Sequence, residues 1–123
     1  MSLPGNGAYQ PAGTHLLADL HGIDAALLRD AGGIDAVLRA AALAAGARIL
    51  HGYFHSFGPE QGVTGVLLLA ESHISIHTWP EGGFAAVDIF MCGSARPQLA
   101  LEHIEAALCP HSSQRRAVVR GLA

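Results

Sequence analysis

The stretch GVTGVLLLAESHISIHTWPEGGFAAVDIFM, residues 62–91, decides the fold. It contains three extended segments, residues 62–70, 73–79 and 84–91, joined by short turns. The middle segment alternates, which puts its isoleucines on one face and its histidines on the other, as in a half-buried strand. Consecutive strands with short connections favour antiparallel pairing. The stretch therefore predicts the centre of an antiparallel sheet.

The flanking sequence predicts further strands and helices around this centre. We expect strands over residues 14–21, 48–57 and 115–120, and helices over residues 24–30, 34–45 and 97–108. Gly32 and Gly33 are expected to separate the first two helices, and Gly46 to end the second. Helices packed on one face of a mainly antiparallel sheet give an α+β fold, a two-layer sandwich.

Length and composition indicate one folded domain. The chain has 123 residues, of which 50% are hydrophobic and 14% charged, typical of a globular domain rather than a disordered chain. Residues 1–13 are rich in glycine and proline, lack the pattern of a signal peptide and are expected to be a flexible leader. Residues 14–123 form the predicted domain. With no apolar run of about 18 residues, we expect no membrane association and a cytoplasmic location.

Charge and residue usage exclude several classes of protein. The formal net charge is −3, and the one basic cluster, Arg115, Arg116 and Arg120, is interpreted as a solvated edge strand, so no nucleic-acid partner is expected. All seven basic residues are arginines. Without lysine the chain cannot hold pyridoxal phosphate as a Schiff base. Two cysteines, Cys92 and Cys109, make neither a disulfide framework nor a structural zinc site.

Two His-x-x-x-His pairs, His51 with His55 and His73 with His77, raise the question of a metal site. On a helix this spacing brings both rings to one face. The residues here favour strands, where four positions span about 13 Å, too far for one ion. We therefore expect no metal.

Ser72 and Cys92 are the candidate nucleophiles. Ser72 lacks the Gly-x-Ser-x-Gly setting of a hydrolase elbow, and Cys92 at a strand end fits a buried filler as well as a reactive thiol. A third possibility is cleavage of the chain between Glu71 and Ser72. The serine hydroxyl would attack the preceding carbonyl, and elimination followed by loss of ammonia would leave a pyruvoyl group. Residue types alone leave these alternatives open.

Two motifs, residues 71–81 (ESHISIHTWPE) and 85–93 (AAVDIFMCG), closely resemble the prokaryotic small-chain S-adenosylmethionine decarboxylase proenzymes. The resemblance continues more weakly over residues 14–108. It implies a carboxy-lyase that decarboxylates S-adenosylmethionine for polyamine (spermidine) biosynthesis. It also implies a homodimer of α+β sandwiches with the active site near the subunit interface.

The resemblance also implies roles for individual residues. Self-cleavage between Glu71 and Ser72 would give a β chain 1–71 and an α chain 72–123. Ser72 would become the pyruvoyl cofactor, which binds the substrate amine as a Schiff base. The other implied roles are processing for His77, with support from Thr64, proton donation for Cys92, and substrate binding for Glu81 and Phe57.

Some positions depart from the family pattern. Thr64 replaces a frequent serine, and Gly82 and Phe84 replace frequent tyrosines of the substrate pocket. The short tail after Cys109 suggests a reduced final strand. Two alternatives therefore accompany the main interpretation. One is an arginine or ornithine decarboxylase on the same scaffold, and the other is a non-cleaving paralogue that binds a ligand.

Overall fold

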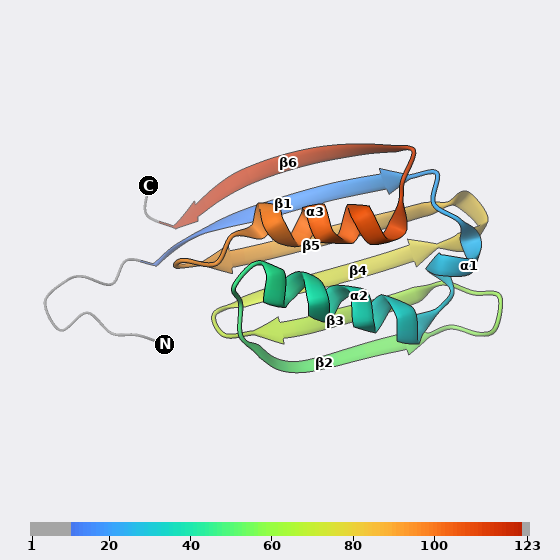
Figure 1. The fold of residues 1–123 in the computed structure, drawn as a ribbon, viewed down its shortest axis with the longest axis horizontal. Helices are drawn as coiled ribbons and strands as arrows, with labels where there is room; N and C mark the ends of the chain where they lie inside the picture. The colour runs from blue at the N-terminus through green and yellow to red at the C-terminus, as the bar shows by residue number, and fades with distance from the viewer. Residues whose placement is uncertain (1–10, 122–123) are drawn as a thin grey trace, which may run out of the picture.

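The protein is built on one six-stranded sheet with the strand order β2-β3-β4-β5-β1-β6 (Figure 1). The computed structural model describes residues 11–121, and all five neighbouring pairs of strands are antiparallel. The strands are β1 (Ala12–His21), β2 (Ile49–Ser56), β3 (Val63–Leu69), β4 (Ser72–Trp79), β5 (Phe84–Cys92) and β6 (Ser112–Gly121). The antiparallel centre predicted from residues 62–91 is thus confirmed.

Two long helices lie on one face of the sheet (Figure 1). They are α2 (Ala31–Ala44) and α3 (Pro97–Leu108), which contact each other, and a short α1 (Ala25–Leu28) precedes them. A 3-10 turn, η1 (Pro80–Gly82), joins β4 to β5. The predicted α+β two-layer sandwich is confirmed. No helix within residues 11–121 is long and apolar enough to cross a membrane.

The core lies between the sheet and the two long helices. Strands contribute alternate side chains to it, as Leu20, Ile74 and Ile76 illustrate, and Leu38 and Leu101 cover them from the helices. Each such large apolar side chain contributes about 1.5–3 kcal/mol when fully buried. The intervening strand residues point to the opposite face, which no described helix covers.

The predicted break between the first two helices was misplaced. Helix α2 begins at Ala31 and runs through Gly32 and Gly33, and the break falls at Arg29 and Asp30. The Asp30 carboxylate caps α2 by accepting a hydrogen bond from the Gly33 N–H at 3.0 Å. A Cβ at Gly33 would come within 2.5 Å of that carboxylate, so glycine here makes room for the cap.

The expectation of a reduced final strand was wrong. Strand β6 has 10 residues and pairs with the whole of β1, from Ala12 opposite Gly121 to His21 opposite Ser112. The free edge of β1 offers a complete row of hydrogen-bonding groups, and the tail after Cys109 is long enough to use them. The interpretation of Arg115 to Arg120 as an exposed edge strand is confirmed.

The bond between Glu71 and Ser72 divides the sheet into interleaved halves. Strands β1, β2 and β3 precede the bond, and β4, β5 and β6 follow it. Because β1 lies between β5 and β6, three hydrogen-bonded pairs, β3–β4, β5–β1 and β1–β6, connect the two halves. A cut at this bond would leave both pieces in one sheet.

Candidate active site

The turn between β3 and β4 places Ser72 in an unusual backbone setting. Glu71 has φ 60°, in the left-handed region that costs a non-glycine residue roughly 1–2 kcal/mol. Ser72 follows as the first residue of β4, and its Oγ accepts a hydrogen bond from the Cys92 backbone N–H at 3.3 Å. The structure thus brings together Ser72 and Cys92, two of the predicted catalytic residues.

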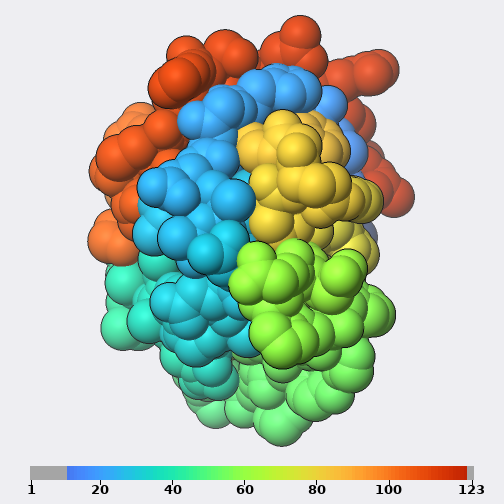
Figure 2. Space-filling view, turned by 90° about the vertical axis from the view of Figure 1, so that its right-hand side faces the viewer, coloured from blue at the N-terminus to red at the C-terminus, as the bar shows by residue number. Residues whose placement is uncertain are grey.

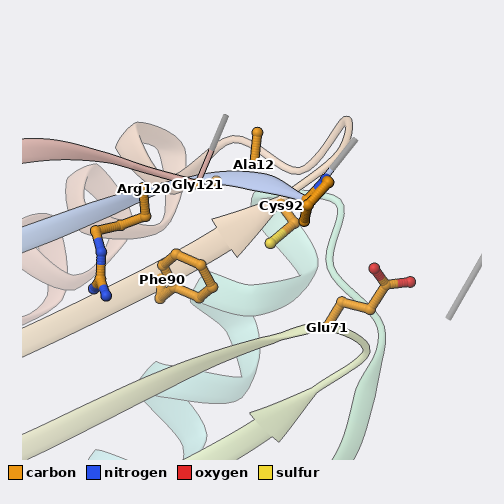
Figure 3. A pocket seen from close by; sticks show the side chains of 8 residues that line it. Ala12, Glu71, Phe90, Cys92, Arg120 and Gly121 are labelled. Carbon is orange, nitrogen blue, oxygen red and sulfur yellow. The ribbon is translucent and has the colours of Figure 1, made fainter. Parts of the chain in front are cut away.

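A cavity of about 330 Å³ opens beside this turn (Figure 3). Figure 3 shows Glu71 at one side of the cavity and Arg120 at the other, with Phe90 and Cys92 between them. The lining comprises Pro11, Ala12, Gly13, Glu71, Phe90, Cys92, Arg120 and Gly121. Apart from the two charged residues and the thiol, it is apolar or backbone.

The Cys92 thiol lies in this first cavity. Burial, and then the nearby carboxylate of Glu71, raise the pKa of Cys92 above its ordinary value. The thiol therefore stays protonated at neutral pH. Gly13 of β1 makes room for it, because a Cβ there would come within 2.9 Å of both Cys92 Sγ and the Phe90 ring.

The remaining predicted site residues gather around a second cavity, of about 370 Å³. Phe57, Thr64, His77 and Glu81 all line it, together with Trp79. Here the Thr64 Oγ1 and His77 Nδ1 are hydrogen bonded at 3.1 Å. This end of the molecule faces the viewer in Figure 2, where the β2–β3 loop (light green) lies beside the turn between β4 and β5 (yellow).

Buried Thr78 holds the walls of the second cavity together. Its Oγ1 donates to the Leu28 carbonyl at 2.6 Å and accepts from the Val63 N–H at 2.8 Å. Gly62 packs against the same residue, since a Cβ there would lie 2.0 Å from the Thr78 carbonyl oxygen. The end of β4 is thereby fixed against the beginning of β3 and the end of α1.

The two cavities are separated by the length of β4. His77 lies five residues beyond Ser72 on the same strand, which corresponds to about 16 Å. Thr64 stands opposite His77, whereas Leu69 stands opposite Ser72. His77 and Thr64, for which the resemblance implies a part in processing, therefore do not lie near Ser72 within one chain, because an extended strand carries them to the far end.

A histidine cluster occupies the uncovered face between the cavities. His15 Nε2 lies 3.4 Å from Asp88 Oδ2, and the His15 and His73 rings meet edge to face. The pKa of His73 is lowered, first by burial and then by His15, while Asp88 opposes the shift. Among residues 11–121 no three His, Cys, Asp or Glu side chains are grouped to hold a metal ion. His51 and His55 lie on strand β2, as expected.

Sequence reasoning missed several residues of these cavities, namely Gly13, Thr78, Phe90 and Arg120. Each depends on pairing between distant strands, as Gly13 does by standing opposite both Cys92 and Arg120. Thr78 belongs to the motif of residues 71–81. A polar residue on the apolar face of an alternating strand indicates a buried group that needs hydrogen-bond partners, and this signal could have identified it. For Arg120 the sequence carried no such signal.

Known proteins resemble this chain over most of its length. A sequence model of the S-adenosylmethionine decarboxylase family matches residues 14–121. An S-adenosylmethionine decarboxylase proenzyme of Acetivibrio thermocellus is 51% identical over 81 residues, covering 66% of this chain and 64%, just under two thirds, of that protein. The proenzyme of Methanococcus maripaludis is 43% identical over 111 residues, covering 89% of this chain and 90% of the relative.

A solved structure agrees with these matches. The crystal structure of the adenosylmethionine decarboxylase from Aquifex aeolicus matches with a TM-score of 0.84 and 38% identity, covering 94% of this chain and 95% of that one. Fold and similarities together define an α+β carboxy-lyase of the kind made as a proenzyme. The chain belongs to the S-adenosylmethionine decarboxylase family, which confirms the resemblance found in the sequence motifs.

Proposed function

We propose that this chain is a pyruvoyl-dependent S-adenosylmethionine decarboxylase that cleaves itself between Glu71 and Ser72. The observation that carries the proposal is the turn at this bond, where Ser72 is held by the Cys92 N–H directly after left-handed Glu71. Cleavage yields a β chain 1–71 and an α chain 72–123. The product, decarboxylated S-adenosylmethionine, serves as the aminopropyl donor for spermidine synthesis.

Cleavage uses the hydroxyl of Ser72. Its oxygen attacks the Glu71 carbonyl carbon, and the peptide C–N bond is exchanged for an ester. Loss of the Ser72 α-proton then breaks the Cβ–O bond, and the Glu71 carboxylate leaves as the new C-terminus. Hydrolysis of the resulting dehydroalanine releases ammonia and leaves a ketone. A cofactor made in this way suits a chain without lysine.

Cys92 is the proton donor of the decarboxylation. The pyruvoyl group supplies the carbonyl that takes up the substrate amine and the electrons left by the carboxylate. Cys92 holds its proton on Sγ inside the cavity, and its raised pKa keeps that proton at neutral pH. Phe90 and the backbone of β1 line the cavity around this thiol.

A second copy of the chain completes the site in this proposal. His77, Thr64, Glu81 and Phe57 lie about 16 Å or more along the sheet from Ser72, too far to act within one chain. The uncovered face carries exposed apolar side chains such as Trp79, which suit burial in a homodimer. In the homodimer, the same four residues of the partner subunit reach Ser72.

Each residue of the second group has a role in the completed site. His77, oriented by the Thr64 hydroxyl, assists the removal of the Ser72 α-proton during processing. Glu81 binds the ribose hydroxyls, and Phe57 stacks on the adenine.

Cys92 and Cys109 are both free thiols, which suits a cytoplasmic location.

Denaturing mass spectrometry and a carbon dioxide assay test the activity. We expect two chains, with a pyruvoyl mass on residues 72–123, and carbon dioxide release from S-adenosylmethionine. Ser72→Ala should remain a single inactive chain. An intact wild-type chain after long incubation, or release from arginine or ornithine alone, would contradict the proposal.

Complementation tests the shared site. We expect His77→Ala chains alone to stay intact, and His77→Ala chains co-expressed with Ser72→Ala chains to be cleaved, because the second variant supplies the missing histidine. Isotopic labelling of one variant identifies the chain that is cut. Absence of cleavage in a co-purified heterodimer would show that His77 does not act across the interface.

A further inference from the structure

We propose that Arg120, on the edge strand β6, is the carboxylate-binding residue of the cavity beside Ser72. The carboxylate has two chemical sources in the proposed function, on which this assignment rests. One is the new C-terminus that cleavage creates at Glu71, and the other is the carboxylate of the amino acid substrate. Both are planar anions that a guanidinium recognises through paired hydrogen bonds.

Strand register brings Arg120 to this cavity. Arg120 stands opposite Gly13 of β1, and Gly13 stands opposite Cys92 of β5, so the three residues form one row across the sheet. The central member of the row has no side chain. No β1 side chain therefore separates Arg120 from the cavity that contains the Cys92 thiol, and the Phe90 ring lies over Gly13, between Arg120 and Cys92 (Figure 3).

The charges around the cavity leave Arg120 available for an anion. Within residues 11–121, Arg29, Arg39 and Arg115 each pair with a carboxylate, whereas Arg120 makes no ion pair with any described residue. Arg120 is also the one cationic side chain among the described residues that line this cavity. Its exposed position at the rim lets it meet an entering ligand.

The proposed chemistry creates a need for this cation. Cleavage creates an α-carboxylate at Glu71, which lines the cavity, and the substrate brings another. A cavity that gathers carboxylates repels the next one unless a cation compensates, and Arg120 is the described lining residue able to do so.

The two sources predict different kinetic effects. If Arg120 binds the leaving carboxylate of Glu71, its loss slows cleavage, because negative charge develops on that group in the elimination. If it binds the substrate carboxylate, its loss raises KM without lowering kcat, because that charge disappears as carbon dioxide leaves. A purely structural role would instead affect stability and both kinetic constants together.

The experiment compares Arg120→Gln, Arg120→Lys and the matched control Arg116→Gln in the full chain. Arg116 lies four residues away on the same strand and makes no ion pair with any described residue. We expect Arg120→Gln either to slow cleavage or to raise KM for S-adenosylmethionine, by roughly tenfold. Arg120→Lys should restore part of the loss, and Arg116→Gln should behave as wild type.

A ligand without the carboxylate charge separates the substrate arm from general damage to the cavity. S-adenosylmethionine methyl ester keeps the amine but lacks the negative charge, so its inhibition constant should be the same for wild type and Arg120→Gln. Equal weakening of ester and substrate would overturn the assignment, as would wild-type cleavage and wild-type KM in Arg120→Gln. Unfolding temperatures show whether Arg120→Gln is folded. If it is misfolded, Arg120→Lys is measured in its place and judged by the same criteria.

Failure of this inference is distinguishable from failure of the proposed function. Wild-type protein that neither cleaves nor releases carbon dioxide contradicts the function itself. Wild-type protein that does both, with an Arg120→Gln variant that matches it, contradicts only the role of Arg120.

Discussion

The Ser72 side-chain oxygen accepts a hydrogen bond from the backbone N–H of Cys92 at 3.3 Å. Cys92 therefore offers two separate groups, a backbone N–H toward the serine and a thiol toward the cavity. Side-chain replacement removes the thiol and keeps the N–H. The proposed processing and decarboxylation stages should consequently be separable at this residue.

Cys92→Ala should cleave at the normal rate and lose decarboxylation. A positioned proton donor typically contributes a factor of 10² to 10⁴, so we expect turnover to fall by at least about 100-fold. Denaturing gels follow cleavage, and carbon dioxide release follows turnover. Cys109→Ala, which replaces the exposed cysteine at the end of α3, is the matched control and should retain both activities. Blocked cleavage in Cys92→Ala would show that the thiol takes part in processing.

Thr64→Val should slow cleavage by roughly tenfold, because the hydrogen bond that orients His77 Nδ1 is lost. Thr64→Ser keeps the hydroxyl and should process normally, and His77→Ala should stall as the intact chain. Time courses of the fresh proenzyme measure the rates. Equal rates for the valine and serine variants would refute an orienting role for the Thr64 hydroxyl.

Turnover should fall at alkaline pH as Cys92 loses its proton. Burial and the Glu71 carboxylate raise the pKa of this thiol, so the fall should lie above the pH range in which an ordinary thiol ionises. Glu71→Gln removes one negative charge and should shift the fall to lower pH. The dependence of kcat on pH, recorded with fully cleaved enzyme, measures the position of this fall. Glu60→Gln, at an exposed glutamate, is the control and should leave the fall where it is in wild type. A fall at higher pH in Glu71→Gln would contradict the sign of the interaction.

Thr78→Val should destabilise the fold. The change leaves the Leu28 carbonyl and the Val63 N–H without the hydroxyl that joins them, at a cost of about 1–3 kcal/mol in the free energy of unfolding. Thr78→Ser keeps the hydroxyl and loses one methyl group, so it should cost about 1 kcal/mol or less. Chemical denaturation on uncleaved Ser72→Ala protein avoids the complication of two chains. A serine variant less stable than the valine variant would disprove the role of the hydroxyl.

The cleaved protein should stay assembled. Strand β1 of the first piece lies between β5 and β6 of the second, so hydrogen-bonded pairs on both sides retain it. Native mass spectrometry should detect both pieces in one complex, and denaturing conditions should separate them. Spontaneous loss of residues 1–71 in native buffer would contradict this arrangement.

The local patterns explain which elements were predictable. The alternation in residues 73–79 and the apolar run before it marked β4 and β3, since strand periodicity is written into neighbouring residues. The helix break was misplaced because Gly33 resembles a helix breaker and in fact accommodates the Asp30 cap. The length of β6 was underestimated because its partner, β1, lies about a hundred residues away in the chain.

The sequence by itself determined the α+β class and the family, and it marked Ser72, His77 and Cys92 as candidate site residues, because motifs and periodicity are local properties. Tertiary structure alone decided which of them meet. Strand pairing placed Cys92 against Ser72 and carried His77 to the other end of β4, since an extended chain advances about 3.3 Å per residue. Strand pairing also placed Arg120 and Cys92 on either side of Gly13, which has no side chain. This relation joins three distant segments, and no local pattern contains it.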